Sequence, residues 1–140
     1  MKPTTLKALT FASLLAVSLP PAIVGTSASP AFAASALQTL DPDKDGTVDL
    51  NEAKAAASAL FDALDVDHDG TLDRKELKDR ISAADWKIAD PDNDKTIRKD
   101  EYLAFVEVAF KRANPDNDAT IDAKELKTPA GHALLRLLIK

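Results

Sequence analysis

Residues 41–52 read Asp-Pro-Asp-Lys-Asp-Gly-Thr-Val-Asp-Leu-Asn-Glu. Carboxylates stand at positions 1, 3, 5, 9 and 12 of this stretch, and the backbone carbonyl of position 7 adds another oxygen. A hard cation prefers such a set of oxygen ligands, and the glycine at position 6 permits the sharp turn that wraps the chain around the ion. The stretch therefore predicts a cation-binding loop.

Three later stretches repeat the pattern, and together the four predict an EF-hand protein. We number them loop one (41–52), loop two (65–76), loop three (90–101) and loop four (114–125). Loop two is as complete as loop one.

Loops three and four depart from the pattern. Loop three has Lys95 at position 6 and Arg98 at position 9, while loop four begins with the neutral Asn114 and has Ala119 at position 6. A side chain forced into the left-handed conformation that glycine accepts costs about 1 kcal/mol or more. We therefore expect these two loops to bind metal weakly or not at all.

Large apolar side chains recur at fixed distances from the loops. One set stands four residues before each loop and predicts helices anchored in a core, and a second set at position 8 predicts short strands that pair the loops. The first set is Leu37, Phe61, Trp86 and Phe110, and the second is Val48, Leu72, Ile97 and Ile121.

Successive loops begin 24, 25 and 24 residues apart, which leaves room for only one helix between neighbours. Apolar residues mark these helices: Ala53, Ala56, Ala57, Leu60 and Leu64 in the first, Leu77, Ile81, Ala84 and Ile88 in the second, and most of 102–113 in the third. The sequence thus predicts one compact all-α EF-hand domain over 34–140, with four loops joined by shared helices in a three-helix bundle.

A strict up-down-up bundle places neighbouring loops at opposite ends of a helix. We therefore expect loop one to lie near loop three, and loop two near loop four. Thr128-Pro129 predicts the start of a closing helix over 130–139. Its leucines should dock on the bundle or on a partner, because so apolar a surface is not left in water.

Residues 1–33 have the pattern of an export signal. Lys2 and Lys7 precede a largely apolar run over 6–19, and Ala31-Phe32-Ala33 predicts cleavage before Ala34. The alternative, a membrane anchor, is disfavoured because the run is interrupted by Ser and Thr and is shorter than the roughly 20 residues of a spanning helix. We expect a periplasmic protein that has no membrane span after removal of the signal.

Composition narrows the function further. With 29% charged and 45% hydrophobic residues the chain is typical of soluble globular proteins, and the absence of cysteine excludes disulfides and thiolate metal sites. The formal charge is −5, and it becomes −7 without residues 1–33, which hold two lysines and no acidic residue. The carboxylates lie almost entirely in the loops, which favours cations as ligands and disfavours nucleic acid.

The sequence does not indicate an enzyme. Every clustered carboxylate belongs to a loop position, and no nucleophile or phosphate-binding loop accompanies them. His68, at position 4 of loop two, and His132, in the closing helix, stand apart, so a transition-metal site is also disfavoured.

The number of carboxylates bears on the identity of the cation. Loops one and two each present five, so Ca²⁺ leaves a net charge of −3 and a lanthanide(III) ion leaves −2. A trivalent ion therefore gains more, although five-carboxylate EF-hands also bind Ca²⁺; Mg²⁺ fits poorly because it demands a compact octahedral geometry. Mutual repulsion predicts a loosely structured metal-free protein that gains helix when metal binds.

Proline at loop position 2 is a more specific feature. It occurs as Pro42, Pro91 and Pro115, whereas loop two has Val66. With the shared helices and the export signal, residues 37–140 resemble the lanmodulin family, the exported lanthanide-binding proteins of methylotrophic bacteria. The resemblance implies selectivity for lanthanide(III) ions over Ca²⁺, strong sites in the first loops, a weak fourth loop and compaction on binding. Because Val66, Lys95 and Arg98 depart from the family pattern, we expect two strong sites.

The resemblance also implies a set of metal ligands, in which each threonine contributes its backbone carbonyl. In loop one they are Asp41, Asp43, Asp45, Thr47, Asp49 and Glu52; in loop two Asp65, Asp67, Asp69, Thr71, Asp73 and Glu76; and in loop three Asp90, Asp92, Asp94, Thr96 and Glu101. The weak set of loop four is Asn114, Asp116, Asp118, Thr120, Asp122 and Glu125.

Two functions fit these features. The first is an exported protein that binds lanthanide(III) ions for uptake, trafficking or storage, with an unidentified protein partner in metal transfer left open. The alternative is a calcium-dependent EF-hand sensor or interaction module, or a plain calcium buffer.

Overall fold

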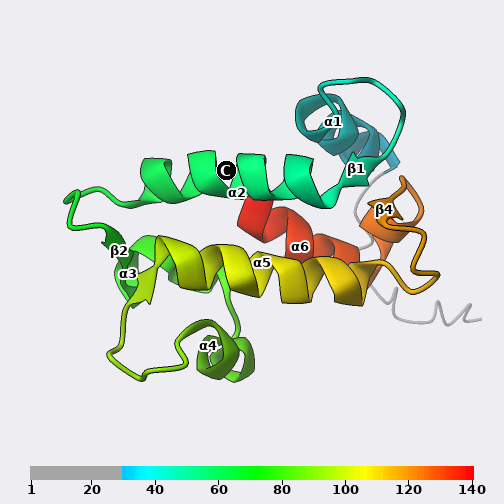
Figure 1. The fold of residues 1–140 in the computed structure, drawn as a ribbon. Coiled ribbons are helices and arrows are strands. Elements are labelled where there is room, and N and C mark those ends of the chain that lie inside the picture. Colours follow the sequence, from blue (N-terminus) through cyan, green and yellow to red (C-terminus); the bar gives the residue numbers. More distant parts are fainter. Residues whose placement is uncertain (1–29) are drawn as a thin grey trace, which may run out of the picture.

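The computed structural model describes residues 30–140, in which helices alternate with the four loops (Figure 1). The fold is all-α and of the compact EF-hand type, as predicted. In chain order the elements are α1 (Pro30–Leu40), β1 (Val48–Asp49), α2 (Leu50–Leu64), β2 (Thr71–Leu72), α3 (Arg74–Leu77), the 3-10 helix η1 (Lys78–Arg80), α4 (Ala83–Ala89), β3 (Ile97–Arg98), α5 (Lys99–Ala113), β4 (Thr120–Ile121), the 3-10 helix η2 (Glu125–Lys127) and α6 (Pro129–Leu138).

The predicted export signal lies outside the described residues, except for 30–33, which begin α1. Within residues 30–140, the helices are all too short or too polar to cross a bilayer.

Three helices, α2, α5 and α6, pack against one another and form the core (Figure 1). The ring centroids of Phe61 in α2 and Tyr102 in α5 lie 5.7 Å apart, and the Tyr102 hydroxyl donates to the Leu137 carbonyl of α6 at 2.9 Å. Burial raises the pKa of Tyr102, so this side chain stays neutral and remains a donor. Burying a side chain of this size contributes roughly 1.5–3 kcal/mol. One tyrosine thus links the three helices.

The apolar patterns of 53–64, 102–113 and the closing helix are confirmed. Their inward faces are buried, and Thr128 caps α6 by accepting from the Gly131 N–H at 3.0 Å. The position 8 residues are also confirmed, because all four are buried and lie in the short strands.

The loops pair differently from the prediction. Loop one pairs with loop four through β1 and β4 (Val48 opposite Ile121), and loop two pairs with loop three through β2 and β3 (Leu72 opposite Ile97). The predicted proximity of loop one to three and of loop two to four is therefore wrong. The cause is that α2 and α5 run antiparallel side by side, so each end of the bundle carries one loop from each helix (Figure 1).

The second predicted shared helix is also wrong. Residues 74–89 form α3, η1 and α4 in place of one continuous helix, because Lys78 leaves the helical conformation with φ 49° and ψ −127° and Ser82 caps a new helix. Ile88, expected on an apolar stripe, is 44% exposed. The chain thereby doubles back and returns loop three to the end of the bundle that holds loop two. Only α2 and α5 are shared helices, and α6 is the third member of the bundle.

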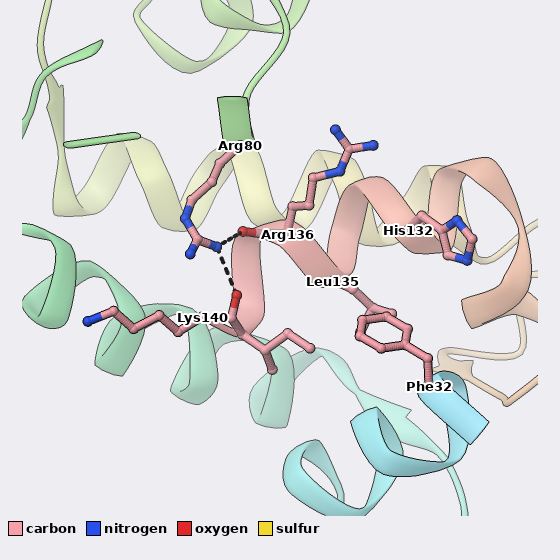
Figure 2. Close-up of a pocket in the computed structure, with 7 residues that line it drawn as sticks. Phe32, Arg80, His132, Leu135, Arg136 and Lys140 are labelled. Atoms are coloured by element: carbon pink, nitrogen blue, oxygen red, sulfur yellow. Dashed lines mark hydrogen bonds between the residues drawn. The ribbon is translucent and has the colours of Figure 1, made fainter. Parts of the chain in front are cut away.

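The C-terminal end of α6 is held by a side chain from this doubled-back segment. One guanidinium nitrogen of Arg80 donates to the carbonyls of Arg136 and Ile139 at 2.7 and 2.8 Å (Figure 2). Arg80 thus satisfies carbonyls that the end of a helix leaves unpaired.

Figure 2 also shows Phe32 of α1 beside Leu135 in a pocket of about 330 Å³. The carboxylates of the four loops do not line this pocket.

Candidate metal centres

Each loop begins where a helix ends. The N–H of the first loop residue donates to the carbonyl of the apolar residue four positions earlier, at 2.8–3.0 Å in all four loops. Phe61, Trp86 and Phe110 are buried and Leu37 is half-buried, which confirms these residues as anchors. A buried side chain and a helical hydrogen bond therefore fix the point at which each loop leaves the core.

Two positions in every loop adopt the left-handed backbone conformation. At position 6, Gly46 and Gly70 have φ 90° and 84°, and Lys95 and Ala119 both have φ 75°, as predicted. Position 4 does so as well, with φ between 57° and 62° in all four loops. Sequence reasoning missed position 4, although the asparagines there in loops three and four were a usable signal, because Asn tolerates this conformation.

In each of the first three loops, three carboxylates converge, and all but Glu76 come from the first five positions of their loop. Oxygens within 4.8 Å of one another come from Asp41, Asp43 and Asp45 in loop one, from Asp65, Asp67 and Glu76 in loop two, and from Asp90, Asp92 and Asp94 in loop three. The first carboxylate of each group is oriented by the N–H of position 6, at 2.8 Å from Gly46, 3.1 Å from Gly70 and 3.2 Å from Lys95.

Positions 5 and 7 interact in all four loops. The threonines Thr47, Thr71, Thr96 and Thr120 each donate both their N–H and their hydroxyl to the aspartate two residues earlier, namely Asp45, Asp69, Asp94 and Asp118. The Thr71 hydroxyl, followed by its N–H, lowers the pKa of Asp69 and keeps that carboxylate ionised.

The last two acidic positions cap the helix that follows. In loop one, Asp49 Oδ1 accepts from the Glu52 N–H and Glu52 Oε2 accepts from the Asp49 N–H, both at 2.8 Å. Asp73 with Glu76 repeats this capping box at α3, and Asp122 with Glu125 makes the same two hydrogen bonds just before η2. The box uses one oxygen of each glutamate and leaves the other, Oε1, directed elsewhere.

Several oxygens at predicted ligand positions are buried without a hydrogen-bond donor in the described part of the chain. At position 1 they are Asp65 Oδ1, Asp90 Oδ1 and Asn114 Oδ1, and at position 12 they are Glu52 Oε1 and Glu125 Oε1. An unpaired buried oxygen is costly, and more so when it is charged. An oxygen-loving cation would coordinate these atoms and remove that cost, so the donor set fits a hard metal ion.

Comparison with known families agrees with this geometry. Residues 58–82 match the family model described as EF hand, and they span the end of α2, loop two, α3 and η1. The chain contains an EF-hand. No curated protein sequence matches it.

Charge inside EF-hand loops one and four is poorly balanced without a cation. Burial is the main effect that raises the pKa of Glu52, and the charges of Asp43, Asp49 and Asp41 raise it further against the hydrogen bond from Asp49. Burial likewise raises the pKa of Glu125. A positive ion would favour the ionised form of both glutamates.

EF-hand loop two satisfies its glutamate in a different way. The N–H of Val66 donates to Glu76 Oε1 at 2.9 Å. Loops one, three and four have proline at that position, and proline has no N–H to donate. The corresponding oxygens of Glu52 and Glu125 are the unpaired ones. The ligand at position 12 of loop two is therefore already engaged, a feature that ligand counting missed although Val66 itself was the signal.

EF-hand loop three carries a positive charge within its ligand set. The guanidinium of Arg98 contacts Asp92 at 2.7 Å and Glu101 at 2.8 Å, and its hydrogen bond to Asp92 lowers the pKa of that carboxyl. Trp86 donates its indole N–H to Asp90 Oδ2 at 3.1 Å. Three of the predicted ligands, Asp90, Asp92 and Glu101, are thus held by side chains of the protein.

EF-hand loop four keeps its shape without the first carboxylate. Asn114 is buried, and its Oδ1 is the unpaired atom at position 1. The Asp116 carboxylate accepts from the Asp118 N–H at 3.4 Å, as its counterpart Asp92 accepts from Asp94 in loop three. The loop presents one charge fewer than loops one and two, in line with a weaker site.

Proposed function

We propose that this protein binds lanthanide(III) ions in preference to Ca²⁺ through loops one and two, after export to the periplasm, and that it serves in uptake, trafficking or storage of these ions. The observation that carries the proposal is the set of buried, unpaired oxygens at ligand positions, among them Glu52 Oε1 and Asp65 Oδ1. These two atoms lie in loops one and two, which hold five carboxylates each.

Coulomb attraction supports a trivalent cargo. At equal distance a trivalent ion is attracted about 1.5 times as strongly as a divalent one by the same carboxylates. Lanthanide ions and Ca²⁺ both accept flexible shells of oxygen ligands, so the protein can distinguish them mainly through charge. Binding and release of a cation, and no catalytic step, is the role that these residues support.

The second candidate is a calcium-dependent sensor or buffer, which the match of residues 58–82 to the EF-hand family supports. Metal competition separates the two functions. The chain without residues 1–33 is titrated with terbium at near-neutral pH, and excess Ca²⁺ is then added. We expect two strongly bound terbium ions that Ca²⁺ does not displace; displacement by Ca²⁺ would overturn lanthanide selectivity.

Matched variants assign the two ions to their loops. Glu52→Gln and Glu76→Gln each keep the size of the position 12 side chain and remove its charge. Each should remove one strongly bound terbium, whereas the same change at Glu107, which lies in α5 away from the loops, should leave both.

A further inference from the structure

The guanidinium of Arg98 lies among four carboxylates. It is 2.7 Å from Asp92, 2.8 Å from Glu101, 3.6 Å from Asp100 and 3.8 Å from Asp94. Asp92, Asp94 and Glu101 occupy positions 3, 5 and 12 of loop three, where a bound metal ion takes its ligands. One side chain therefore reaches the oxygens that a cation would gather.

The same atoms behave differently in the other loops. Glu101 Oε1 accepts a hydrogen bond from the Arg98 guanidinium, whereas the equivalent Oε1 atoms of Glu52 and Glu125 have no hydrogen-bond donor. Glu101 is also buried, so its charge needs a partner. Position 9, where Arg98 stands, is the slot that holds an aspartate in loops one, two and four. At position 9, loop three therefore has a positive charge where the other three loops have a carboxylate.

We propose that Arg98 is a tethered cation that takes the place of metal in loop three, so that this loop stays folded without an ion and does not bind one strongly. Arginine suits the task because its planar fork holds two carboxylates at once and stays charged at every physiological pH. The inference rests on the proposed function and deepens it, since it explains why loop three does not strongly bind the metal ion that we propose for loops one and two.

The position of Arg98 gives loop three a second role. Arg98 lies opposite Thr71 in the pairing of β2 with β3. The residue that neutralises the carboxylates of loop three therefore also belongs to β3, the strand that pairs with loop two. A loop that keeps its fold without metal offers its neighbour a formed strand before any ion arrives. Loop two therefore gains a prebuilt partner, and less ordering remains to be done when its metal binds.

The first test uses no metal. In EDTA, amide hydrogen exchange of loop three is compared among wild type, Arg98→Gln and the control Arg112→Gln. Arg112 is a matched control, because it is as exposed as Arg98 and forms a 2.7 Å ion pair with Asp85 outside the loops. We expect Arg98→Gln alone to speed exchange in loop three severalfold. Equal exchange in both variants would overturn the proposal.

The second test asks whether removal of the charge opens the site. The Glu76→Gln background prevents loop two from binding metal strongly. In this background, Arg98→Asp introduces the aspartate that the other three loops have at position 9. We expect one additional terbium ion by native mass spectrometry and new terbium emission sensitised by Trp86, which hydrogen-bonds to Asp90. No gain of an ion would overturn the proposal. If wild-type loops one and two bind no terbium, the proposed function fails, while the exchange test in EDTA still decides the role of Arg98.

Discussion

At the scale of single residues, the left-handed backbone at loop position 6 carries a conformational free-energy cost that depends on whether the residue has a Cβ. Ala119 has φ 75°, a conformation that disfavours any residue with a Cβ. Ala119→Gly should therefore stabilise the metal-free protein by up to about 1 kcal/mol. Urea denaturation in EDTA measures this, with Ala104→Gly on the exposed face of α5 as the control that should destabilise. Equal losses in the two variants would contradict the prediction.

Position 2 of loop two permits a second test on one residue. Val66→Pro removes the N–H that holds Glu76 Oε1, which frees that oxygen for the metal. The residue before Val66 already has the conformation that precedes the native prolines, with ψ 85° in loop two against 79° and 80° in loops three and four. We expect terbium to bind loop two more tightly by about 1 kcal/mol, or roughly fivefold.

The control for this change is Val66→Ala, which keeps the N–H and trims a side chain that is 77% exposed. Isothermal titration of the three proteins compares their affinities. Equal affinity of the proline and alanine variants would show that the hydrogen bond to Glu76 does not compete with metal.

Much at this scale could be predicted from the sequence, because the loops are local structures. The strained Lys95 and Ala119, the anchors and the buried position 8 residues all follow from spacing within one repeat. The contacts of Arg98 and Val66 could not be predicted by counting ligands, because they depend on where a side chain or an N–H points once the loop has closed. Counting ligands gives Arg98 only as a missing carboxylate, whereas in the structure its guanidinium contacts Asp92 and Glu101 of the same loop.

At the scale of elements, the break between α3 and α4 determines which loops meet. Lys78 has φ 49° and ψ −127°, which is the first central position of a type II′ turn and is normally glycine. Lys78→Gly should stabilise the protein by about 1–2 kcal/mol, because it relieves this strain. Thermal unfolding in EDTA checks it, and Lys87→Gly within α4 should have the opposite sign. A loss of stability in Lys78→Gly would contradict the assignment of strain.

The break between α3 and α4 could not be predicted from the spacing of apolar residues. Leu77, Ile81, Ala84 and Ile88 fit one helical stripe, and no glycine or proline interrupts 74–89. The usable signal was Ser82, which accepts from the Asp85 N–H at 3.1 Å and begins α4 as an N-cap. Nothing in the local sequence marks Lys78 as a turn residue, so the helical pattern alone could not predict where the helix breaks.

An ion-pair bridge between α2 and α5 makes the stability of the fold depend on pH. Glu107 accepts from Lys111 at 2.9 Å and from Lys54 of α2 at 3.0 Å, and these lysines lower its pKa from 4.5 to about 2. A lowered folded-state pKa stabilises the fold above the unfolded pKa, and that stability is lost as the pH falls through the folded pKa. Glu107→Gln should therefore be less stable than wild type at pH 7, with a difference that shrinks between about pH 4.5 and 2.

Denaturation midpoints in EDTA across this pH range test the bridge. Asp79→Asn, in the exposed turn η1, is the control and should show no such trend. A stability difference for Glu107→Gln that stays constant as the pH falls would mean that the carboxylate does not act through its charge.

At the scale of the whole molecule, the charge of the loops couples metal binding to folding. The chain without residues 1–33 has a formal charge of −7, and most of its carboxylates belong to the four loops, which lie in pairs at the two ends of the bundle (Figure 1). Each bound ion removes repulsion and adds its binding free energy to the stability of the fold. We expect circular dichroism to show more helix and a higher melting temperature with terbium than in EDTA. Identical spectra in the two states would contradict this coupling.

The pairing of loops across the bundle is the property of the whole molecule that sequence reasoning had wrong, and it can be measured in solution. Gd³⁺ is bound to loop one in a Glu76→Gln variant, so that loop two stays empty. Because β1 pairs with β4, the Gd³⁺ should broaden the amide signals of Thr120 and Ile121 in loop four. Thr96 and Ile97 of loop three lie at the opposite end of the 15-residue helix α2, a length of roughly 22 Å, and should stay sharper. Stronger broadening in loop three would instead support the up-down-up arrangement, in which α2 and α5 are parallel and loops one and three share an end.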